Sequence, residues 1–189
     1  MSGTLRVPTP EALRATFGRY PSGLTVITAF DGDEPVGMTL QAFHALSLEP
    51  PLVLLCPGRT STTWPRLERA ARLCVNVLAE DQHALARAFA RSGADRFDGV
   101  AWTRATDLGV PVLDGAVAWL ACTLERRWPA GDHHIAVCRV RSMGASEGER
   151  PLVFFRSAMW SLAPTALDQD GNGREETPVQ RIETGRSSR

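Results

Sequence analysis

Two long runs suited to β-strands lie almost back to back in the second half of the chain. Apolar side chains recur along residues 116–128 and 134–144, and Pro129-Ala130-Gly131-Asp132 lies between the two runs. Proline, glycine and aspartate favour tight turns, so this pair predicts an antiparallel β-hairpin. It is the strongest hairpin pattern in the sequence.

Shorter apolar runs predict further strands. Turn residues such as Asp31-Gly32-Asp33 and Pro50-Pro51 separate several of them. The predicted strands cover residues 24–30, 36–39, 52–56, 73–78, 152–155 and 159–162. The chain is therefore expected to be mainly β.

Three helices are predicted between these strands. Thr9 and Pro10 suit the N-cap and the first position of a helix. Leu13 and Phe17 are four residues apart in that helix, so we expect them to share one buried face. A second helix is expected over residues 60–72.

The third helix is expected after a cap at Asp81, and residues 92–113 are expected to be mostly loop. Three helices are too few to cover a doubly wound parallel sheet, so the pattern predicts an antiparallel barrel with helices at its flanks. This domain would span residues 9–163. Residues 1–8 are expected to be flexible, and the polar residues 164–189 to form a disordered tail.

The charge balance limits the partners of the chain. Lys+Arg and Asp+Glu both number 21 among 189 residues. This argues against a nucleic-acid binder, because such proteins neutralise phosphates with surplus cations. No apolar run approaches the roughly 20 residues that span a bilayer, and residues 1–10 lack the layout of a signal peptide. We therefore expect a cytosolic protein that binds neither nucleic acid nor membranes.

The residues that ligate metals are not arranged as in common metal sites. Asp132-His133-His134 suggests a metal, but adjacent residues on a strand point to opposite faces. The four cysteines are far apart in apolar runs, where buried reduced thiols are favoured over metal ligands. They are Cys56, Cys74, Cys122 and Cys138. The motifs of Rossmann sites, P-loops, zinc proteases and serine hydrolases do not occur, so no metal is expected.

Two segments in the first half of the chain suit a flat ligand that carries phosphate. Gly37 and the small or polar residues after it end a predicted strand, which lets a ring approach the backbone closely. The alternative is a strand that simply enters a loop. Ser61 and Thr62 precede a predicted helix, where hydroxyls and N–H groups suit phosphate. Ordinary helix capping explains one such residue equally well.

Two later segments place charged and aromatic residues where they can meet the same ligand. Arg96 can pair with a phosphate and Phe97 can cover an aromatic ring, although a helix end closed by a hydrophobic plug is the alternative. His133 opens a strand after a Gly-Asp turn, where an imidazole can donate to an anion or to a nicotinamide amide. The alternative for His133 is a turn with an exposed side chain.

Taken in order, these segments resemble the flavin reductase-like family, whose fold is the FMN-binding split barrel. The resemblance runs from about residue 13 to residue 162. Its markers are YPSGLTVITA, GMT followed by LSLEPPLVLLC, LCVNVL with LARAFA, DRF, VLDGAVAWLACTL and GDHHI. The chain is similar above all to the small reductase components of two-component flavin-dependent monooxygenases. The resemblance implies an antiparallel split β-barrel of Greek-key type with flanking α-helices.

The resemblance also implies which residues bind the flavin, FAD or FMN. Those at the isoalloxazine ring and the ribityl chain would be Gly37, Met38, Thr39, Leu40, Gln41 and Ala42. Those near the chain and phosphate, or closing the site, would be Cys56, Ser61, Thr62, Arg96 and Phe97. Relatives usually carry two serines where this chain has Gln41 and Ala42, and much of the contact is expected from backbone N–H groups.

Three residues would meet the nicotinamide nucleotide, NADH or NADPH: His133, Arg156 and Trp160. Hydride would pass directly between the two cofactors, so no catalytic side chain is required. The protein would hold the nicotinamide C4 over the flavin N5 and place N–H donors at the N1–C2=O side. The reduced flavin would then leave for a partner monooxygenase.

Two alternatives to a reductase stay open. One is a flavin-binding or flavin-carrying protein without nicotinamide-dependent turnover, and the other is a structural dimer partner whose site has decayed. His133 and Arg156 favour the reductase, since a carrier needs no nicotinamide site. We also expect a homodimer, because the small barrels of this family pair, and the apolar strands would otherwise leave a large exposed patch.

Overall fold

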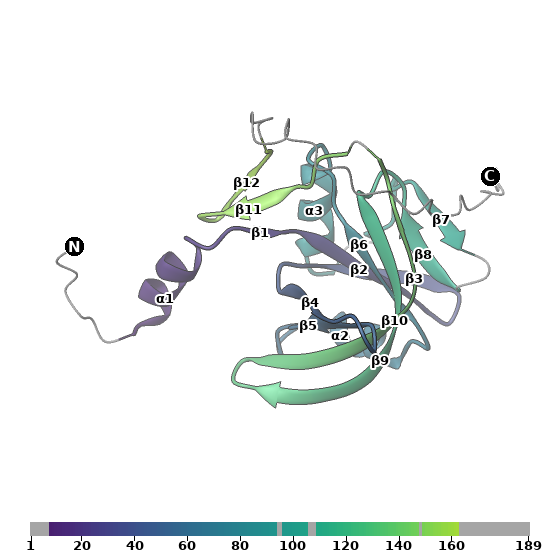
Figure 1. Ribbon diagram of the computed structural model, residues 1–189, viewed down its shortest axis with the longest axis horizontal. Coiled ribbons are helices and arrows are strands. Elements are labelled where there is room, and N and C mark those ends of the chain that lie inside the picture. The colour runs from purple at the N-terminus through teal and green to yellow at the C-terminus, as the bar shows by residue number, and fades with distance from the viewer. Residues whose placement is uncertain (1–7, 94–95, 106–108, 148, 163–189) are drawn as a thin grey trace.

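Antiparallel strands make up most of the regular secondary structure of the described residues (Figure 1). The computed structural model describes residues 8–93, 96–105, 109–147 and 149–162. The expected tail, residues 164–189, and residues 1–7 lie outside these ranges. Within the described ranges no helix is long and apolar enough to cross a membrane. The same residues contain no group of three His, Cys, Asp or Glu side chains placed to hold a metal ion.

Seven strands form one large sheet in the order β3-β2-β6-β9-β10-β5-β4. They are β2 (Thr25–Asp31), β3 (Glu34–Leu40), β4 (Phe43–Ser47), β5 (Leu52–Leu55), β6 (Leu73–Val77), β9 (Ala118–Ala130) and β10 (His133–Ala145). The two edge strands, β3 and β4, are consecutive in the chain, and only Gln41 and Ala42 separate them. The end of β3 therefore lies close to the start of β4, which requires the sheet to curl between its two edge strands.

The β9–β10 hairpin confirms the strongest pattern in the sequence. Its strands pair along their whole length, and the turn consists of Gly131 and Asp132. Gly131 has a φ of 61°, a left-handed conformation that glycine adopts without strain. Register shifts after Val137 and Val140 are β-bulges. Bulges bend and twist a strand, which lets this hairpin follow the curl of the sheet.

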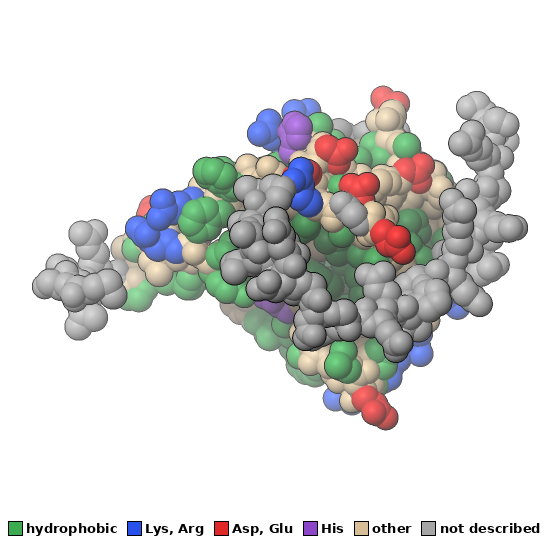
Figure 2. Space-filling view, turned by 45° about the horizontal axis from the view of Figure 1, so that its top comes forward, with side chains coloured by type: hydrophobic (Ala, Val, Ile, Leu, Met, Phe, Trp, Pro, Cys, Tyr) green, Lys and Arg blue, Asp and Glu red, His purple; other side chains and the backbone are tan. Residues whose placement is uncertain are grey.

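A smaller sheet carries an N-terminal arm. Its strands are β1 (Ser22–Gly23), β11 (Val153–Phe155) and β12 (Ala158–Trp160), and α1 (Pro10–Phe17) precedes it. Thr9 caps α1 as expected, because its hydroxyl accepts a hydrogen bond from the Ala12 amide at 3.2 Å. The expected buried face is wrong, since Leu13 and Phe17 are 37% and 67% exposed. The helix projects away from the large sheet with apolar side chains on its surface (Figure 2).

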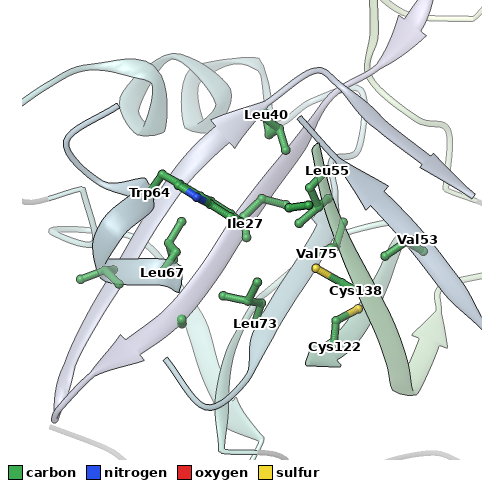
Figure 3. Packing of buried hydrophobic residues seen from close by; sticks show 13 residues of the cluster. Ile27, Leu40, Val53, Leu55, Trp64, Leu67, Leu73, Val75, Cys122 and Cys138 are labelled. Atoms are coloured by element: carbon green, nitrogen blue, oxygen red, sulfur yellow. The ribbon is translucent and has the colours of Figure 1, made fainter. Parts of the chain in front are cut away.

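One core fills the inside of the curled sheet (Figure 3). Every strand of the large sheet contributes side chains that pack in it or against it, and α2 (Trp64–Arg69) adds Trp64 and Leu67. Leu40, next to the sheet edge, and Leu55 of β5 point into the same interior in Figure 3. The β3 end of the sheet is therefore anchored in the core from within.

Three buried cysteines are free thiols, two of them in this core and Cys74 in a separate cluster with Ala105 and Val110. Cys74, Cys122 and Cys138 are fully buried. Burial raises the pKa of Cys74 and of Cys138 to about 12, because an interior without water disfavours the thiolate. These side chains act as small apolar groups, as expected.

Three expected elements differ from the structure. Residues 92–113, expected to be mostly loop, contain a two-stranded sheet of β7 (Trp102–Ala105) and β8 (Val110–Leu113). The helix expected over residues 60–72 is limited to α2, because the chain becomes extended at Ala70. The third helix, α3 (His83–Ala90), begins after Gln82 rather than Asp81.

Buried polar side chains hold β8 in place. The Thr28 hydroxyl donates to the Pro111 carbonyl oxygen at 2.6 Å, and the Leu113 amide donates to Asn76 Oδ1 at 2.9 Å. Asn76 is fully buried, and its Nδ2 donates to the Val26 carbonyl oxygen at 3.0 Å. Side chains of β2 and β6 thus bind the backbone of β8, an interaction that no apolar pattern predicts.

Candidate functional site

The first predicted segment begins at Gly37, in the middle of edge strand β3. A Cβ atom there would lie 2.7 Å from Phe89 Cε1 of α3 and 3.0 Å from the Ile27 carbonyl oxygen. Both distances are too short for a real side chain, so glycine is required for α3 to pack on the strand. A close approach to the backbone was expected at Gly37. The group that approaches is the Phe89 ring of α3, in the same chain, and not a ligand.

The side chains of the next residues serve the fold. The Thr39 hydroxyl donates to the Ala86 carbonyl oxygen of α3 at 2.6 Å. Leu40 is 6% exposed, and its carbonyl oxygen accepts from the Thr25 hydroxyl at 2.7 Å. Because β3 is an edge strand, alternate backbone groups point away from β2. A ligand beside β3 would therefore meet mainly backbone donors and acceptors.

The link between β3 and β4 brings three predicted residues together. The Phe43 amide donates to the Gln41 carbonyl oxygen at 2.9 Å, which closes a three-residue turn. The Cys56 amide donates to the Ala42 carbonyl oxygen at 3.0 Å. Cys56 is half-buried, and burial raises the pKa of its thiol. The sulfur beside the link therefore stays protonated at neutral pH and is a poor nucleophile.

The loop that leads to α2 is fastened to the tip of the β9–β10 hairpin. The His134 amide donates to the Pro57 carbonyl oxygen at 2.9 Å, and Gly58 forms an isolated bridge with His133. A Cβ on Gly58 would lie 3.9 Å from His133 Nε2, so the imidazole sits against this loop. His133 is thereby placed beside the segment that leads to Ser61.

Ser61 connects this loop to β3. Its hydroxyl accepts from the Trp64 amide at 3.1 Å and donates to the Met38 sulfur at 3.6 Å. The first contact satisfies the first amide of α2 from two residues before the N-cap, Thr63, a local role close to the capping alternative for this segment. The second contact places residues 61–63, the hydroxyl segment, next to the middle of β3.

Arg96 connects the strand segment, residues 37–42, to the hydroxyl segment. Its Nη1 donates to the Gly37 carbonyl oxygen at 2.5 Å and to Thr63 Oγ1 at 2.6 Å, while Nε donates to the Arg91 carbonyl oxygen at 2.7 Å. All three acceptors are neutral, and none of the described carboxylates pairs with Arg96. Burial, and then the nearby charge of Arg66, lower the pKa of the Arg96 guanidinium. The cation is fixed in position, and its charge is not compensated by the described residues.

A cavity of about 410 Å³ opens beside this arginine. Four of the predicted flavin residues line it, namely Gly37, Thr62, Arg96 and Phe97. Phe97 is only 8% exposed and makes edge contacts with Phe89 and Trp102, with ring centroids 5.0 and 5.9 Å apart. It forms a firm wall of the cavity, held in place by other aromatic rings.

The three residues predicted at the nicotinamide nucleotide lie in two places. His133 is at the hairpin tip, where its Nδ1 is 2.7 Å from the Asp132 carboxylate, and this contact lowers the pKa of Asp132. Arg156 and Trp160 belong to the small sheet, where Trp160 Nε1 donates to the Phe155 carbonyl oxygen at 3.0 Å. The hairpin tip and β11–β12 lie well apart in Figure 1. A single chain does not bring these three side chains together.

Arg66 and Glu34 also line the cavity, and sequence reasoning missed both. Arg66 Nε donates to Asp31 Oδ2 at 2.7 Å, and Arg66 Nη2 donates to Glu34 Oε2 at 2.8 Å. The bond from Arg66 lowers the pKa of Asp31. The sequence holds one clue, a cation that follows the Ser61–Thr62 pair by about one helical turn.

The same chain segments match a known family. Residues 17–163 fit the family described as flavin reductase like domain. The chain belongs to the flavin reductase family. The reductase subunit HsaB of a flavin-dependent monooxygenase from Rhodococcus jostii is 43% identical over 155 residues, which are 82% of this chain and 79% of that protein.

Other members of the flavin reductase family are similar over most of their length. The NADH-dependent FAD reductase of Streptomyces globisporus is 37% identical over 158 residues, covering 82% of this chain and 86% of that protein. The solved structure of the NADH:FAD oxidoreductase SgcE6 from Streptomyces globisporus, in complex with NAD and FAD fragments, has a TM-score of 0.80. It is 36% identical and covers 86% of this chain and 99% of that one.

Proposed function

We propose that this protein is an NAD(P)H-dependent flavin reductase, which reduces FAD or FMN and releases the reduced flavin to a partner monooxygenase. The observation that carries the proposal is the position of Arg96. The Arg96 guanidinium, which pairs with none of the described carboxylates, binds both Gly37 of the strand segment and Thr63 of the hydroxyl segment. Relatives named as flavin reductases and monooxygenase reductase subunits support the same activity.

The chain contributes binding and charge to this reaction. Bound flavin and nicotinamide nucleotide supply the hydride transfer itself. The free edge of β3 offers backbone N–H groups, and such donors stabilise negative charge as it develops on a ring oxygen. Arg96 offers its charge to a phosphate. Cys56 stays protonated because burial raises the pKa of its thiol, so it takes no part as a nucleophile.

We infer that the active form is a homodimer. Phe17 and Tyr20 on the N-terminal arm are 67% and 69% exposed, and Trp160 on the small sheet is 54% exposed. Exposed apolar surface of this kind marks interaction sites. A second copy seated on this arm would add a neighbour's side chains to the region that includes Arg156. The two groups of nicotinamide residues could then meet across the interface.

Three finer points belong to the same proposal. We infer that the domain spans residues 9–163 and that its large sheet closes into the split barrel of Greek-key type. The short link of Gln41 and Ala42 between the edge strands supports this closure. We also place the protein in the cytosol, where free thiols such as Cys74 and Cys138 persist.

The activity is tested with purified protein and NADH, with and without added FAD or FMN, and with NADPH in parallel. We expect oxidation of NADH that depends on added flavin and saturates with it. Flavin binding without oxidation of either nucleotide would favour a flavin carrier. Failure to bind both flavins would overturn the reductase and the carrier together.

A further inference from the structure

The cavity beside Arg96 extends along the first half of β3, from Glu34 to Gly37, whereas the other predicted ring contacts follow Gly37. Glu34 and Pro35 line the cavity, while Gln41 follows the last residue of the strand. A strand advances about 3.3 Å per residue, so Glu34 and Gln41 are roughly 20 Å apart. The Glu34 end of the cavity is therefore too distant from the link to hold the ring that the link would bind.

The hydroxyl segment lies between these two ends. Ser61 contacts Met38 in the middle of β3, and the next residue, Thr62, lines the cavity. A flavin with its ring at the link and its phosphate at Ser61 and Thr62 would place that phosphate at the entrance of the cavity. FMN ends at this phosphate, whereas FAD continues with a second phosphate, a ribose and adenine.

The size of the cavity fits a ligand larger than a phosphate group. Its volume of about 410 Å³ falls within the usual range for small-molecule sites, about 300–1,000 Å³. One phosphate at Thr62 would leave most of this space to be filled. The space available matches a nucleotide better than an isolated anion.

Two guanidinium groups make the cavity suitable for a pyrophosphate. Arg66 and Arg96 both line it and are close enough for the charge of Arg66 to act on Arg96. Arg66 is paired with Asp31 and Glu34, while the recorded acceptors of Arg96 are all neutral oxygens. Two cations side by side repel each other, and an anion placed between them removes that repulsion.

Glu34 adds the group that a ribose requires. Its side chain is 68% exposed, and Oε2 accepts from Arg66. Among the described residues no partner is recorded for Oε1. A carboxylate is the usual acceptor for ribose hydroxyls in dinucleotide sites. The lining thus offers cations for phosphate and a carboxylate for a sugar within one cavity.

We propose that this cavity binds the adenylyl half of FAD, with its second phosphate at Arg66 and its ribose at Glu34, while Arg96 contacts the first phosphate, which FAD and FMN share, and that FAD is therefore preferred to FMN. This inference rests on the proposed function. The same adenosine diphosphate chemistry occurs in NADH. FAD is favoured as the source because its flavin phosphate, at Thr62, leads directly into the cavity.

The test measures dissociation constants of FAD and FMN for the full chain by titration of flavin fluorescence. Arg66→Gln should raise the constant for FAD about 10-fold to 100-fold, the effect of losing a charge-assisted contact, and change that for FMN less than about twofold. Glu34→Gln preserves the shape of the side chain and should weaken FAD alone, by about 2-fold to 10-fold.

Arg69→Gln is the matched control. Arg69 is on the same helix and lies 3.5 Å from the same Asp31 carboxylate, but it does not line the cavity. Its substitution should leave the ratio of FAD to FMN affinity unchanged. Thermal melting of each variant checks that the fold is intact.

Three results would overturn the inference. Equal losses for FAD and FMN in Arg66→Gln would place Arg66 at the first phosphate. If Arg66→Gln raised the Michaelis constant for NADH and left the ratio of FAD to FMN affinity unchanged, the cavity would be assigned to the nicotinamide nucleotide. In both cases flavin reduction itself persists, so the proposed function stands. A wild-type protein that binds neither flavin would overturn both.

Discussion

The surroundings of β3 and the N-terminal arm are held in opposite ways. At β3, Thr39 binds the backbone of α3, Gly37 is packed under Phe89, and Arg96 ties the strand to Thr63. In the arm, α1 has no buried residue. The proposed flavin site is thus preorganised within one chain, whereas the arm has exposed apolar surface on which we propose that a second copy docks.

The largest effect, on flavin affinity, is expected from removing the Arg96 side chain that links β3 to Thr63. Arg96→Ala should raise the dissociation constants of both FAD and FMN about 10-fold to 100-fold, since a charge-assisted contact contributes about 1.5–3 kcal/mol. Turnover at saturating flavin should fall less. Fluorescence titration and NADH oxidation measure the two quantities. The exposed Arg87 of α3 provides the control variant, Arg87→Ala. Unchanged affinity for both flavins would place Arg96 outside the binding site.

The packing around Gly37 allows the surroundings of β3 and the N-terminal arm to be compared by the free energy of unfolding. Gly37→Ala inserts a Cβ 2.7 Å from Phe89 and 3.0 Å from the Ile27 carbonyl oxygen, so the free energy of unfolding should fall by about 1–3 kcal/mol. Gly23→Ala in β1 meets nothing within 4 Å and should change it by less than about 0.5 kcal/mol. Urea denaturation measures both. Equal effects at the two glycines would remove the contrast between the regions.

Variants at the hairpin tip are expected to separate nicotinamide binding from flavin binding. His133→Ala should raise the Michaelis constant for NADH about 2-fold to 10-fold, the loss of one hydrogen bond, and leave the dissociation constant of oxidised flavin nearly unchanged. His134 is the control, because it faces the other side of the strand, with its Nδ1 3.3 Å from Arg127 Nη1. Sensitivity at His134 alone would reverse the assigned facing, and indifference at both would favour the flavin carrier.

The smallest change in protomer stability is expected in the arm. Phe17→Ser removes an exposed apolar side chain and should alter the free energy of unfolding of a dilute protomer by less than about 0.5 kcal/mol. It should nevertheless shift a dimer toward monomer in sedimentation velocity, because the ring would lie in the interface. Arg14→Gln on the same helix is the control. A wild-type protein that sediments as a fully active monomer would contradict the homodimer.

Local patterns predicted what local forces determine. The β9–β10 hairpin was predicted because Gly131 and Asp132 favour a turn, and the start of α1 because Thr9 and Pro10 suit its first positions. The flavin segments were located by the resemblance to the family. Arg96 and Thr62 then lie on one cavity in the structure.

Contacts between distant segments were beyond these patterns. Leu13 and Phe17 indicate which side of α1 is apolar, but a helical repeat does not identify what covers that side. The role of Arg66 depends on Asp31, which is 35 residues away in the chain. β8 was missed because its position depends on polar bonds from other strands, which leave no periodic trace in its own sequence.

The bonds to β8 also determine which strand registers are possible. Asn76 and Thr28 bind two backbone atoms, the Leu113 amide and the Pro111 carbonyl oxygen. A slip of β8 by one residue would leave these buried groups unpaired, at a cost of about 1–3 kcal/mol for each. Shifted pairings of β8 are therefore rare in the native ensemble.

This restriction reaches the cavity through two rings. Leu113 pairs with Trp102 across the two-stranded sheet of β7 and β8, and the edge of Trp102 packs against Phe97, with ring centroids 5.9 Å apart. A slipped β8 would move Trp102 and leave Phe97 without its support. The buried amide of Asn76 thus supports one wall of the candidate site from a distance, and an apolar replacement of Asn76 is expected to loosen that wall before it unfolds the protein.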